Sequence, residues 1–289
     1  MPELPEVETI RRGLQGCILG QAIRKVKVLE PKAFLGRKEE VEGARVSRLR
    51  RFGKALIIDL DNGYSIMIHL RMTGQLIFEG EGERFAGGHP NESFVAELPN
   101  RQTRVIFELA EGKLFFNDQR KFGFSKVLAT EKVEEDEFIK KLGKEPWAMT
   151  VQELAEKTKK HKQAPIKAVL LDQTVMAGLG NIYADETLFF AGVHPERRAG
   201  ALDDEEIERI LEGARKTMAD SIKAGGSTIA NYVKADGTRG DYLEKFAQIF
   251  KREGESCRKC GGVVKKIRVA GRGTHICENC QKLERGRHD

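Results

Sequence analysis

The stretch Lys54-Ala-Leu-Ile-Ile-Asp-Leu60, Asp61-Asn62-Gly63, Tyr64-Ser-Ile-Met-Ile-His-Leu70 holds two apolar runs on either side of a turn signal. Runs of this kind joined by Asn-Gly predict a β-hairpin. Similar runs cover residues 75–78, 103–109 and 113–116, and Glu111-Gly112 is a second turn signal. Many short strands with tight turns are typical of a sandwich or a barrel. We therefore expect a β-region over about 22–128, with residues 79–102, which are polar and rich in Gly and Glu, as a long exposed loop.

Helical periodicity flanks this β-region on both sides. Residues 5–19 carry Val7, Ile10 and Leu14 at helical spacing. After a charged stretch at 130–146, which we interpret as a linker, the period returns in an apolar stripe. Asp203 is a candidate cap for this later helix, and Gly225-Gly226 is a stop signal. The stripe consists of Ile207, Ile210, Leu211, Ala214, Met218 and Ile222. A length of 289 residues suits two domains.

The net charge of +6 is concentrated at one end of the chain. Residues 251–289 hold eleven Lys or Arg against five Asp or Glu, and residues 1–250 balance at 39 against 39. A basic terminal module suits a polyanion such as nucleic acid, although a tail that serves solubility has the same charge. No stretch approaches the ~20 apolar residues of a membrane span, and no secretory signal is visible. We expect a cytoplasmic protein.

Four of the five cysteines lie in this basic tail: Cys257, Cys260, Cys277 and Cys280. Two Cys-x2-Cys pairs separated by 16 residues have the spacing of a four-cysteine zinc site. Disulfides are the alternative, which a cytoplasmic location disfavours. We predict one structural Zn²⁺, because four thiolates leave no coordination position for water. Cys17 stands alone in an apolar setting and is expected to be an inert core residue.

The chain begins Met1-Pro2-Glu3-Leu4-Pro5-Glu6, which places an amine beside a carboxylate. Removal of Met1 is expected before a small residue and would leave Pro2 with a free secondary amine. An α-amino group has a pKa of about 7.7–8.0, so part of it is neutral and nucleophilic near pH 7. Such an amine forms a Schiff base with a carbonyl-like carbon, and Glu3 could donate a proton. Taken alone, the segment is more simply interpreted as an ordinary helix start.

Two further motifs are weak by themselves. In Gly178-Leu179-Gly180-Asn181 a turn precedes a helix, where backbone N–H groups and an amide can hold a phosphate, although a plain capped turn is the simpler interpretation. In Asp118-Gln119-Arg120-Lys121-Phe122-Gly123, cations and an aromatic beside a glycine could form a wedge that enters a base stack. A hairpin with a buried Phe122 is the competing interpretation.

Taken together and in this order, the amino-terminal segment, Arg120-Lys121-Phe122-Gly123, Gly178–Glu186 and the four-cysteine finger resemble the bacterial formamidopyrimidine-DNA glycosylases. The resemblance runs from Pro2 to about Gln281. It implies an α+β, two-domain fold, in which an N-terminal β-sandwich with flanking helices precedes a helical helix–two-turns–helix domain and a four-cysteine β-hairpin zinc finger. The implied divisions are a catalytic domain at 1–130, a linker at 131–149, the helical domain at 150–246 and the finger at 247–282.

The resemblance also implies a role for each matching residue. Pro2 would be the nucleophile on the anomeric carbon, Glu3 the acid that assists ring opening, Lys54 a lysine near the reacting sugar, and Glu6 a member of the lesion pocket. The residues implied to fill the void left by the base are Met72, Arg120 and Phe122. The residues implied to lie against the DNA or its phosphates are Lys167, Asn181 and Arg272. Residues 227–242 would cover the base-capping loop.

The implied reaction removes oxidised purines (8-oxoguanine and formamidopyrimidines) from double-stranded DNA and also cleaves abasic sites by β,δ-elimination. The implied protein is bacterial and associated with the nucleoid, and the lack of an apolar seam in the sequence favours a monomer. An endonuclease VIII-type enzyme for oxidised pyrimidines is a second hypothesis, which Leu4 and Arg120–Gly123 disfavour. A third is a non-catalytic protein that binds damaged DNA, which leaves Pro2 and Glu3 unexplained.

Two positions depart from the pattern of this family. Where the family usually carries Lys-His-x-His, this chain has Arg101-Gln102-Thr103-Arg104, which retains positive charge but no histidine. Phe250 stands where a tyrosine is usual. These changes leave the expected chemistry intact and put the detailed substrate range in doubt.

Overall fold

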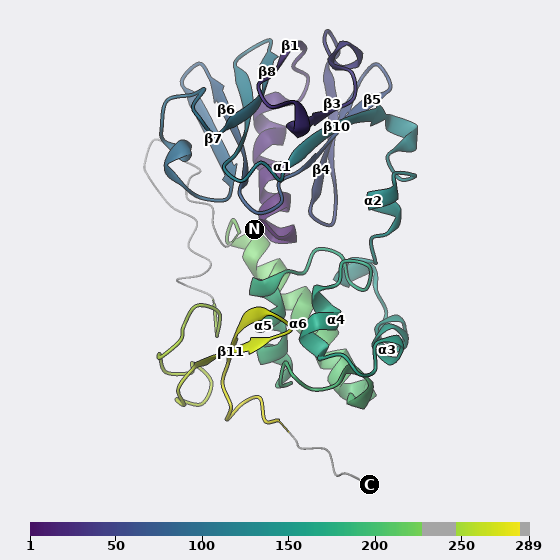
Figure 1. Ribbon diagram of the computed structural model, residues 1–289, viewed down its shortest axis with the longest axis vertical. Helices are drawn as coiled ribbons and strands as arrows, with labels where there is room; N and C mark the ends of the chain where they lie inside the picture. The colour runs from purple at the N-terminus through teal and green to yellow at the C-terminus, as the bar shows by residue number, and fades with distance from the viewer. Residues whose placement is uncertain (227–246, 284–289) are drawn as a thin grey trace. The chain divides into compact units, whose positions relative to one another are not determined.

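The computed structural model describes residues 1–226 and 247–283 (Figure 1). The described residues form two compact units, the first comprising 1–140 and 222–226 and the second 141–221 and 247–283. The predicted base-capping loop at 227–242 lies outside the described residues. The helices are α1 (Leu4–Ile18), α2 (Glu137–Lys140), α3 (Val151–Lys160), α4 (Ile166–Leu171), α5 (Asn181–Ala191) and α6 (Asp204–Lys223).

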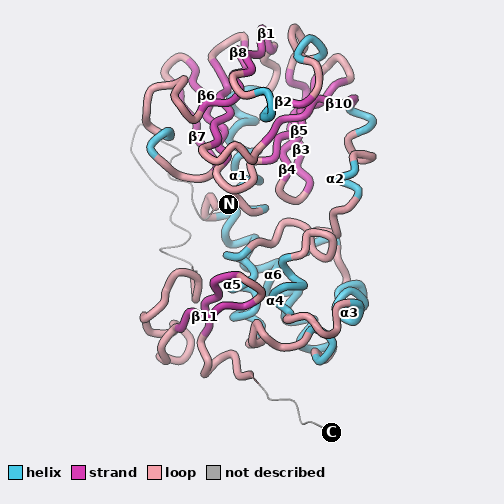
Figure 2. The backbone as a smooth tube through the Cα atoms, viewed as in Figure 1, coloured by secondary structure: helices cyan, strands magenta, loops and turns pink. Residues whose placement is uncertain are grey.

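Two five-stranded sheets make up most of the first unit (Figure 2). One has the order β1-β8-β9-β6-β7 and the other β2-β10-β5-β4-β3. Neighbouring strands are antiparallel except β2 and β10, which are parallel. The strands are β1 (Ile23–Val28), β2 (Phe34–Leu35), β3 (Val46–Phe52), β4 (Ala55–Leu60), β5 (Tyr64–His69), β6 (Gly74–Gly80), β7 (Glu83–Gly88), β8 (Thr103–Leu109), β9 (Lys113–Asp118) and β10 (Phe124–Ala129).

The core of the first unit lies between these sheets, so the fold is a sandwich and not a barrel. Buried side chains from both sheets and from α1 form one hydrophobic cluster, to which α1 contributes Val7, Ile10 and Leu14. The helix packs on β7 of one sheet and on β3 of the other (Figure 1). Its residues approach closely: a Cβ on Gly13 would lie 2.1 Å from the ring of Phe85. This helix carries the amino-terminal segment.

The prediction of a long exposed loop at 79–102 is wrong. Residues 83–88 form β7, and a 3₁₀ turn follows at Glu92–Phe94. Phe94 and the half-buried Leu98 cover a second apolar cluster made by Ile77, Ala86, Ile106 and Phe115. The glycines concealed the strand in the sequence, but one of them is required by packing, because a Cβ on Gly87 would lie 2.5 Å from Ile10. Strands buried on both faces need such a cover, since their outward apolar residues would otherwise meet water.

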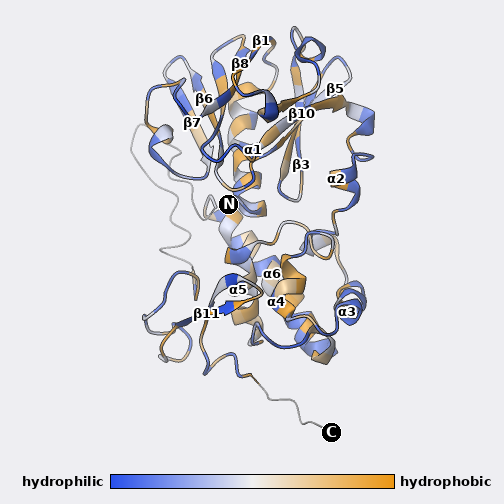
Figure 3. Cartoon of the chain, in the orientation of Figure 1, coloured by the Kyte–Doolittle hydropathy of each residue, from blue (hydrophilic) through white to orange (hydrophobic). Residues whose placement is uncertain are grey.

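The second unit contains α3 to α5, most of α6, and the hairpin of β11 (Lys265–Val269) and β12 (Arg272–Ile276). The predicted stripe of α6 is buried from Ile207 to Met218. Asp203 accepts the N–H of Glu206 at 2.7 Å and caps this helix, as predicted, and the chain turns at Gly225 and Gly226 with positive φ. Figure 3 shows α4 as mainly hydrophobic and α3 as mainly hydrophilic, in agreement with the buried Ile166, Val169 and Leu170. Among the described helices, none is long and apolar enough to cross a membrane.

Candidate functional site

The amino-terminal segment enters α1 directly. Glu3 is the N-cap residue of this helix, and the Glu6 carboxylate accepts the Glu3 N–H at 2.8 Å in a capping box. Pro5 occupies the first turn, where its missing N–H costs no helical hydrogen bond. Glu3 and Glu6 are each only 2% exposed, and Pro2 is buried beside them. The start of the helix therefore holds an imino acid and two buried carboxyl groups together.

Lys54 lies in the tight turn between β3 and β4 and is largely buried. The turn is attached to α1 through Arg51, which donates to the Gly53 carbonyl at 2.9 Å and to Glu8 at 3.2 Å. Burial by itself would raise the pKa of Glu8, but hydrogen bonds from Arg11 and Arg12 together with the charges of Arg11 and Arg51 lower it to about 2. Glu8 is therefore ionised near neutral pH and holds the Lys54 turn against the helix that begins at Glu3.

Met72, Arg120 and Phe122 lie on two neighbouring loops of the first unit. Met72 is in the turn before β6, and residues 119–123 join β9 to β10. Phe122 is 55% exposed, so the competing interpretation of a buried Phe122 is wrong. The guanidinium of Arg120 lies 4.8 Å from the centre of the Phe122 ring. The three predicted void-filling side chains thus lie on adjacent loops, and two of them are stacked on each other.

In the second unit, Asn181 is the first residue of α5, as the motif predicts. Its amide donates to the Gly273 carbonyl at 3.0 Å, which ties the start of the helix to the zinc hairpin. The preceding turn is organised by Gln173, which the sequence did not single out. Its side chain accepts the Gly178 N–H at 3.0 Å and donates to the Leu179 carbonyl at 2.8 Å.

The prediction that Lys167 lies against DNA needs correction, because this side chain is completely buried. Its Nζ lies 2.6 Å from Asp185 Oδ1, 2.7 Å from Thr274 Oγ1 and 3.2 Å from the Gly273 carbonyl. Asp185 also accepts the backbone N–H of His275 at 2.9 Å. Lys167 therefore fastens α4 and α5 to β12. Asp185 was missed because a single carboxylate inside a helix gives no signal of its distant partners.

Arg272 is exposed beside the two-residue turn of the finger hairpin. Ala270 and Gly271 both have positive φ, as a tight hairpin turn requires. Strand β12 runs from Arg272 directly to Thr274, which is hydrogen-bonded to Lys167. The cation is thus presented by a turn whose strand is anchored on α4 and α5.

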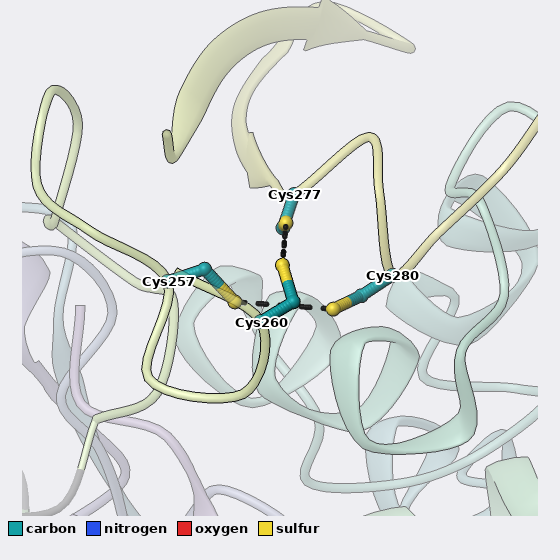
Figure 4. Close-up of side chains that lie close together, drawn as sticks. All are labelled: Cys257, Cys260, Cys277 and Cys280. Atoms are coloured by element: carbon teal, nitrogen blue, oxygen red, sulfur yellow. Dashed lines mark hydrogen bonds between the residues drawn. The ribbon is translucent and has the colours of Figure 1, made fainter. Parts of the chain in front are cut away.

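The four predicted cysteines converge on one point (Figure 4). Their Sγ atoms all lie within 4.8 Å of one another, and the Cys260–Cys277 and Cys257–Cys280 separations are 3.4 and 3.9 Å. Zn–S bonds of about 2.3 Å in a tetrahedron require sulfurs roughly 3.8 Å apart, so the donor set fits zinc. The N–H groups of Lys259 and Gly262 point at Cys257 and Cys260, both at 3.4 Å, and support their thiolate forms. The finger holds one structural zinc ion.

At both departures from the family pattern, a side chain is buried in the fold. Arg104 is buried and donates to the Asp118 carbonyl at 2.8 Å and to the Arg101 carbonyl at 3.0 Å, so it supports the end of β9. Phe250 packs edge-on against His275, with ring centroids 5.0 Å apart. Its backbone N–H donates to the buried Glu186, which also accepts the N–H groups of Gln248 and Ile249. Burial raises the pKa of Glu186.

Comparison with protein families gives three matches along the chain. Residues 1–125 match the formamidopyrimidine-DNA glycosylase N-terminal domain, 142–233 the H2TH domain of the same family, and 254–283 the zinc finger found in FPG and IleRS. Formamidopyrimidine-DNA glycosylases of Pelotomaculum thermopropionicum and Listeria innocua are each 40% identical. Both matches cover 98% of this chain and 100% of the relative.

Solved structures are similar over the same extent. A variant of the Lactococcus lactis FPG with a Fapy-dG-containing DNA matches with a TM-score of 0.85 and 33% identity, over 98% of this chain and 100% of that one. The Lactococcus lactis enzyme non-covalently bound to DNA with an AP site matches with a TM-score of 0.83 and 32% identity, over 97% and 100%. Identity above 30% over full-length chains is evidence of a shared family and not only of a shared fold.

Proposed function

This chain belongs to the formamidopyrimidine-DNA glycosylase family, and we propose that it removes oxidised purines from DNA with the amine of Pro2 as its nucleophile. It is a base-excision repair DNA glycosylase and lyase. The observation that carries the proposed nucleophile is the start of α1, where Pro2 adjoins the buried Glu3 and Glu6. Neither a DNA-binding module nor a hydrolase that activates water needs a free proline at this place.

The chemistry follows from what a secondary amine can do. With Met1 removed, the nitrogen lone pair of Pro2 attacks the anomeric carbon of the damaged nucleotide, and the base leaves with its bonding electrons and a proton. Glu3 supplies a proton as the sugar ring opens. The product is an iminium, which acidifies the neighbouring sugar hydrogens. Loss of one sugar proton then expels the 3′ phosphate, and loss of a second sugar proton expels the 5′ phosphate. With Met1 in place the nitrogen is an amide, and the reaction cannot begin.

The remaining residues are assigned to binding. Lys54 is proposed to lie at the reacting sugar and its phosphates, and Glu6 in the lesion pocket. Met72, Arg120 and Phe122 are proposed to fill the space left by the extruded base. Asn181 and Arg272 are proposed to hold phosphates. The partner is double-stranded DNA that contains oxidised bases or abasic sites. We further propose that the chain acts as a monomer at the nucleoid, and that its domains follow the division at 130, 150 and 247.

The decisive experiment is borohydride trapping on a duplex with one 8-oxoguanine. The reductant converts the iminium to a stable amine, so an adduct should form, and mass mapping should locate it at Pro2. A form shown by mass to keep Met1, in which the Pro2 nitrogen is an amide, should lower trapping by roughly 100-fold or more, as loss of a nucleophile does. The matched control is Pro5→Gly, which changes a proline in the same helical turn and leaves the amine in place.

Two outcomes would contradict the proposal. Trapping that survives the loss of the Pro2 amine would exclude this nucleophile. Cleavage of a thymine-glycol duplex much faster than an 8-oxoguanine duplex would move the substrate to oxidised pyrimidines. Both duplexes should be compared under single-turnover conditions with the same preparation of protein lacking Met1.

A further inference from the structure

Asp118, the last residue of β9, has a side chain that the proposed chemistry does not use. The side chain is completely buried, and its carboxylate accepts several hydrogen bonds from neighbouring groups. Oδ2 accepts the N–H groups of Phe122 at 2.8 Å and Gly123 at 2.7 Å, and Oδ1 accepts that of Arg120 at 3.1 Å. One carboxylate therefore fixes the backbone of most of the loop that carries Arg120 and Phe122.

The same carboxylate reaches the second loop through Thr73. The Thr73 hydroxyl donates to Asp118 Oδ1, and its oxygen accepts the N–H of Arg120 at 3.0 Å. Thr73 is buried and follows Met72 directly in the chain. The loop with Met72 and the loop with Arg120 and Phe122 are thus joined by one hydroxyl and one carboxylate.

These bonds maintain a conformation that the loop does not favour by itself. Lys121 has φ +58°, a left-handed region that non-glycine residues rarely occupy. Gly123 is confined, because an added Cβ would lie 2.8 Å from the ring of Phe116 and 3.1 Å from the His69 carbonyl. In this conformation Arg120 stacks on Phe122, whose ring is exposed.

We propose that Thr73 and Asp118 are positioning residues, which order Met72, Arg120 and Phe122 as one preformed wedge before DNA is bound. This inference rests on the proposed function, because it concerns the side chains assigned to the space left by the base. A base that leaves the stack returns quickly unless its place is filled. A wedge that is already ordered fills the gap without the entropy cost of ordering two loops at that moment.

The test compares Thr73→Val with Thr73→Ser. Valine keeps the shape of threonine but removes the hydroxyl, whereas serine keeps the hydroxyl. Thr158→Val is the matched control, because Thr158 is also buried and its hydroxyl donates within its own helix, to the Ala155 carbonyl at 2.8 Å. Excision of 8-oxoguanine is measured in single turnover, and cleavage of a preformed abasic site is measured in parallel.

We expect Thr73→Val to slow excision of 8-oxoguanine by about tenfold or more, because a buried carboxylate loses one donor and the loops lose their link. Thr73→Ser and Thr158→Val should stay within about twofold of the parent rate, which is the scatter of neutral substitutions. Cleavage of the abasic site should change by less than about threefold in all variants, since no base has to be extruded. Equal excision by Thr73→Val and Thr73→Ser would overturn the proposal.

A double-mutant cycle with Phe122→Ala keeps the proposal testable if Thr73→Val loosens the fold. Phe122 is exposed, so its truncation removes the ring on which Arg120 stacks and leaves the core intact. If Thr73 acts through the wedge, Thr73→Val should cost less than about twofold in the Phe122→Ala background. Multiplicative losses would mean a merely structural role and would refute the inference. A parent enzyme that excises no lesion would contradict the proposed function itself, a result distinct from either outcome.

Discussion

The void-filling loops of the first unit and the zinc hairpin of the second are both short turns, but different contacts fix them. The loops extend from a sandwich whose core is an apolar cluster shared by two sheets and α1. The hairpin depends on four cysteines, on the buried Lys167–Asp185 pair and on the buried Glu186. The sandwich that carries the loops is therefore held mainly by apolar packing, whereas the hairpin is held mainly by charge and metal. Conditions that remove the metal or the buried charges should therefore destabilise the second unit more than the first.

Removal of zinc should have the largest effect and should be confined to the second unit. Structural zinc contributes about 10–16 kcal/mol in isolated finger peptides, far more than a hairpin of this size gains from packing. We expect a strong chelator to unfold the hairpin and to abolish tight DNA binding, while the β-sheet circular dichroism remains. Zinc content, circular dichroism and fluorescence anisotropy of a labelled duplex are the measurements. Restored binding after zinc is returned is the control, and undiminished binding by zinc-free protein would refute the prediction.

Breaking the buried ion pair of the second unit should come next. Lys167→Met leaves the Asp185 carboxylate buried without its cation, which typically costs about 3–5 kcal/mol. Trp147, the only tryptophan, belongs to the second unit, so its fluorescence reports the unfolding of that unit. The midpoint of unfolding followed by fluorescence should fall, while the unfolding of the first unit followed by β-sheet circular dichroism should change little.

The exposed pair Lys216–Asp220 on α6 is the matched control for this experiment. Lys216→Met removes the same charge in the same unit, and exposed pairs contribute at most about 1 kcal/mol. Equal shifts for Lys167→Met and Lys216→Met would show that burial of the pair has no consequence. The ion-pair interpretation of Lys167 would then be wrong.

The comparison between the units also explains what the sequence could predict. Strands with a central apolar run, such as 103–109, were predicted correctly, because they are buried on both faces. Strand β7 was missed because its glycines, which usually indicate turns, are there to let α1 approach. The four cysteines were recognised because their ligand spacing is local. Such patterns involve residues that are close in the chain, so they can be recognised in the sequence alone.

Contacts between distant residues were not predictable in the same way. Lys167 looks like any surface lysine, and only the fold brings it to Asp185 and Thr274. Asp118 belongs to a recognisable sequence motif. The four groups that donate hydrogen bonds to its carboxylate, however, come from two loops and give no repeating pattern in the sequence. The resemblance supplied candidate roles for Met72, Arg120 and Phe122. It did not supply the groups that hold them in place.

Within the first unit, Gly13→Ala tests how strictly shape determines the fold. A methyl group at Gly13 would collide with the ring of Phe85, and overpacking of this kind costs typically about 1–3 kcal/mol. Gly16 lies three residues along the same helix with nothing within 4 Å of an added Cβ. Gly16→Ala should therefore stabilise the unit by about 0.5–1 kcal/mol. Chemical denaturation followed by circular dichroism measures both, and equal signs for the two substitutions would contradict the close packing of α1.

A further expected effect is a dependence of the first unit on acid, which comes from His69 at the end of β5. Burial, and then the nearby charges of Arg71 and Lys54, lower the pKa of His69 from 6.5 to about 3. The unfolded chain therefore binds the proton between these two values and the folded chain does not. Stability from His69 is complete above about pH 6.5 and is lost as the pH falls towards 3, by at most about 1.4 kcal/mol per pH unit.

His69→Asn isolates this contribution, because an amide oxygen can still accept the Arg71 N–H that His69 Nδ1 accepts at 3.0 Å. The variant should unfold with a flatter pH dependence between about 6.5 and 4.5, since one titrating group is missing. The pKa of Glu8 is lowered from 4.5 to about 2, so its own contribution is lost only below that window and does not interfere. If the pH dependence of stability, followed by β-sheet circular dichroism, is the same for parent and variant, His69 binds a proton in the folded chain as readily as in the unfolded one. The first unit would then depend on charge as the second does, and the contrast between them would fail.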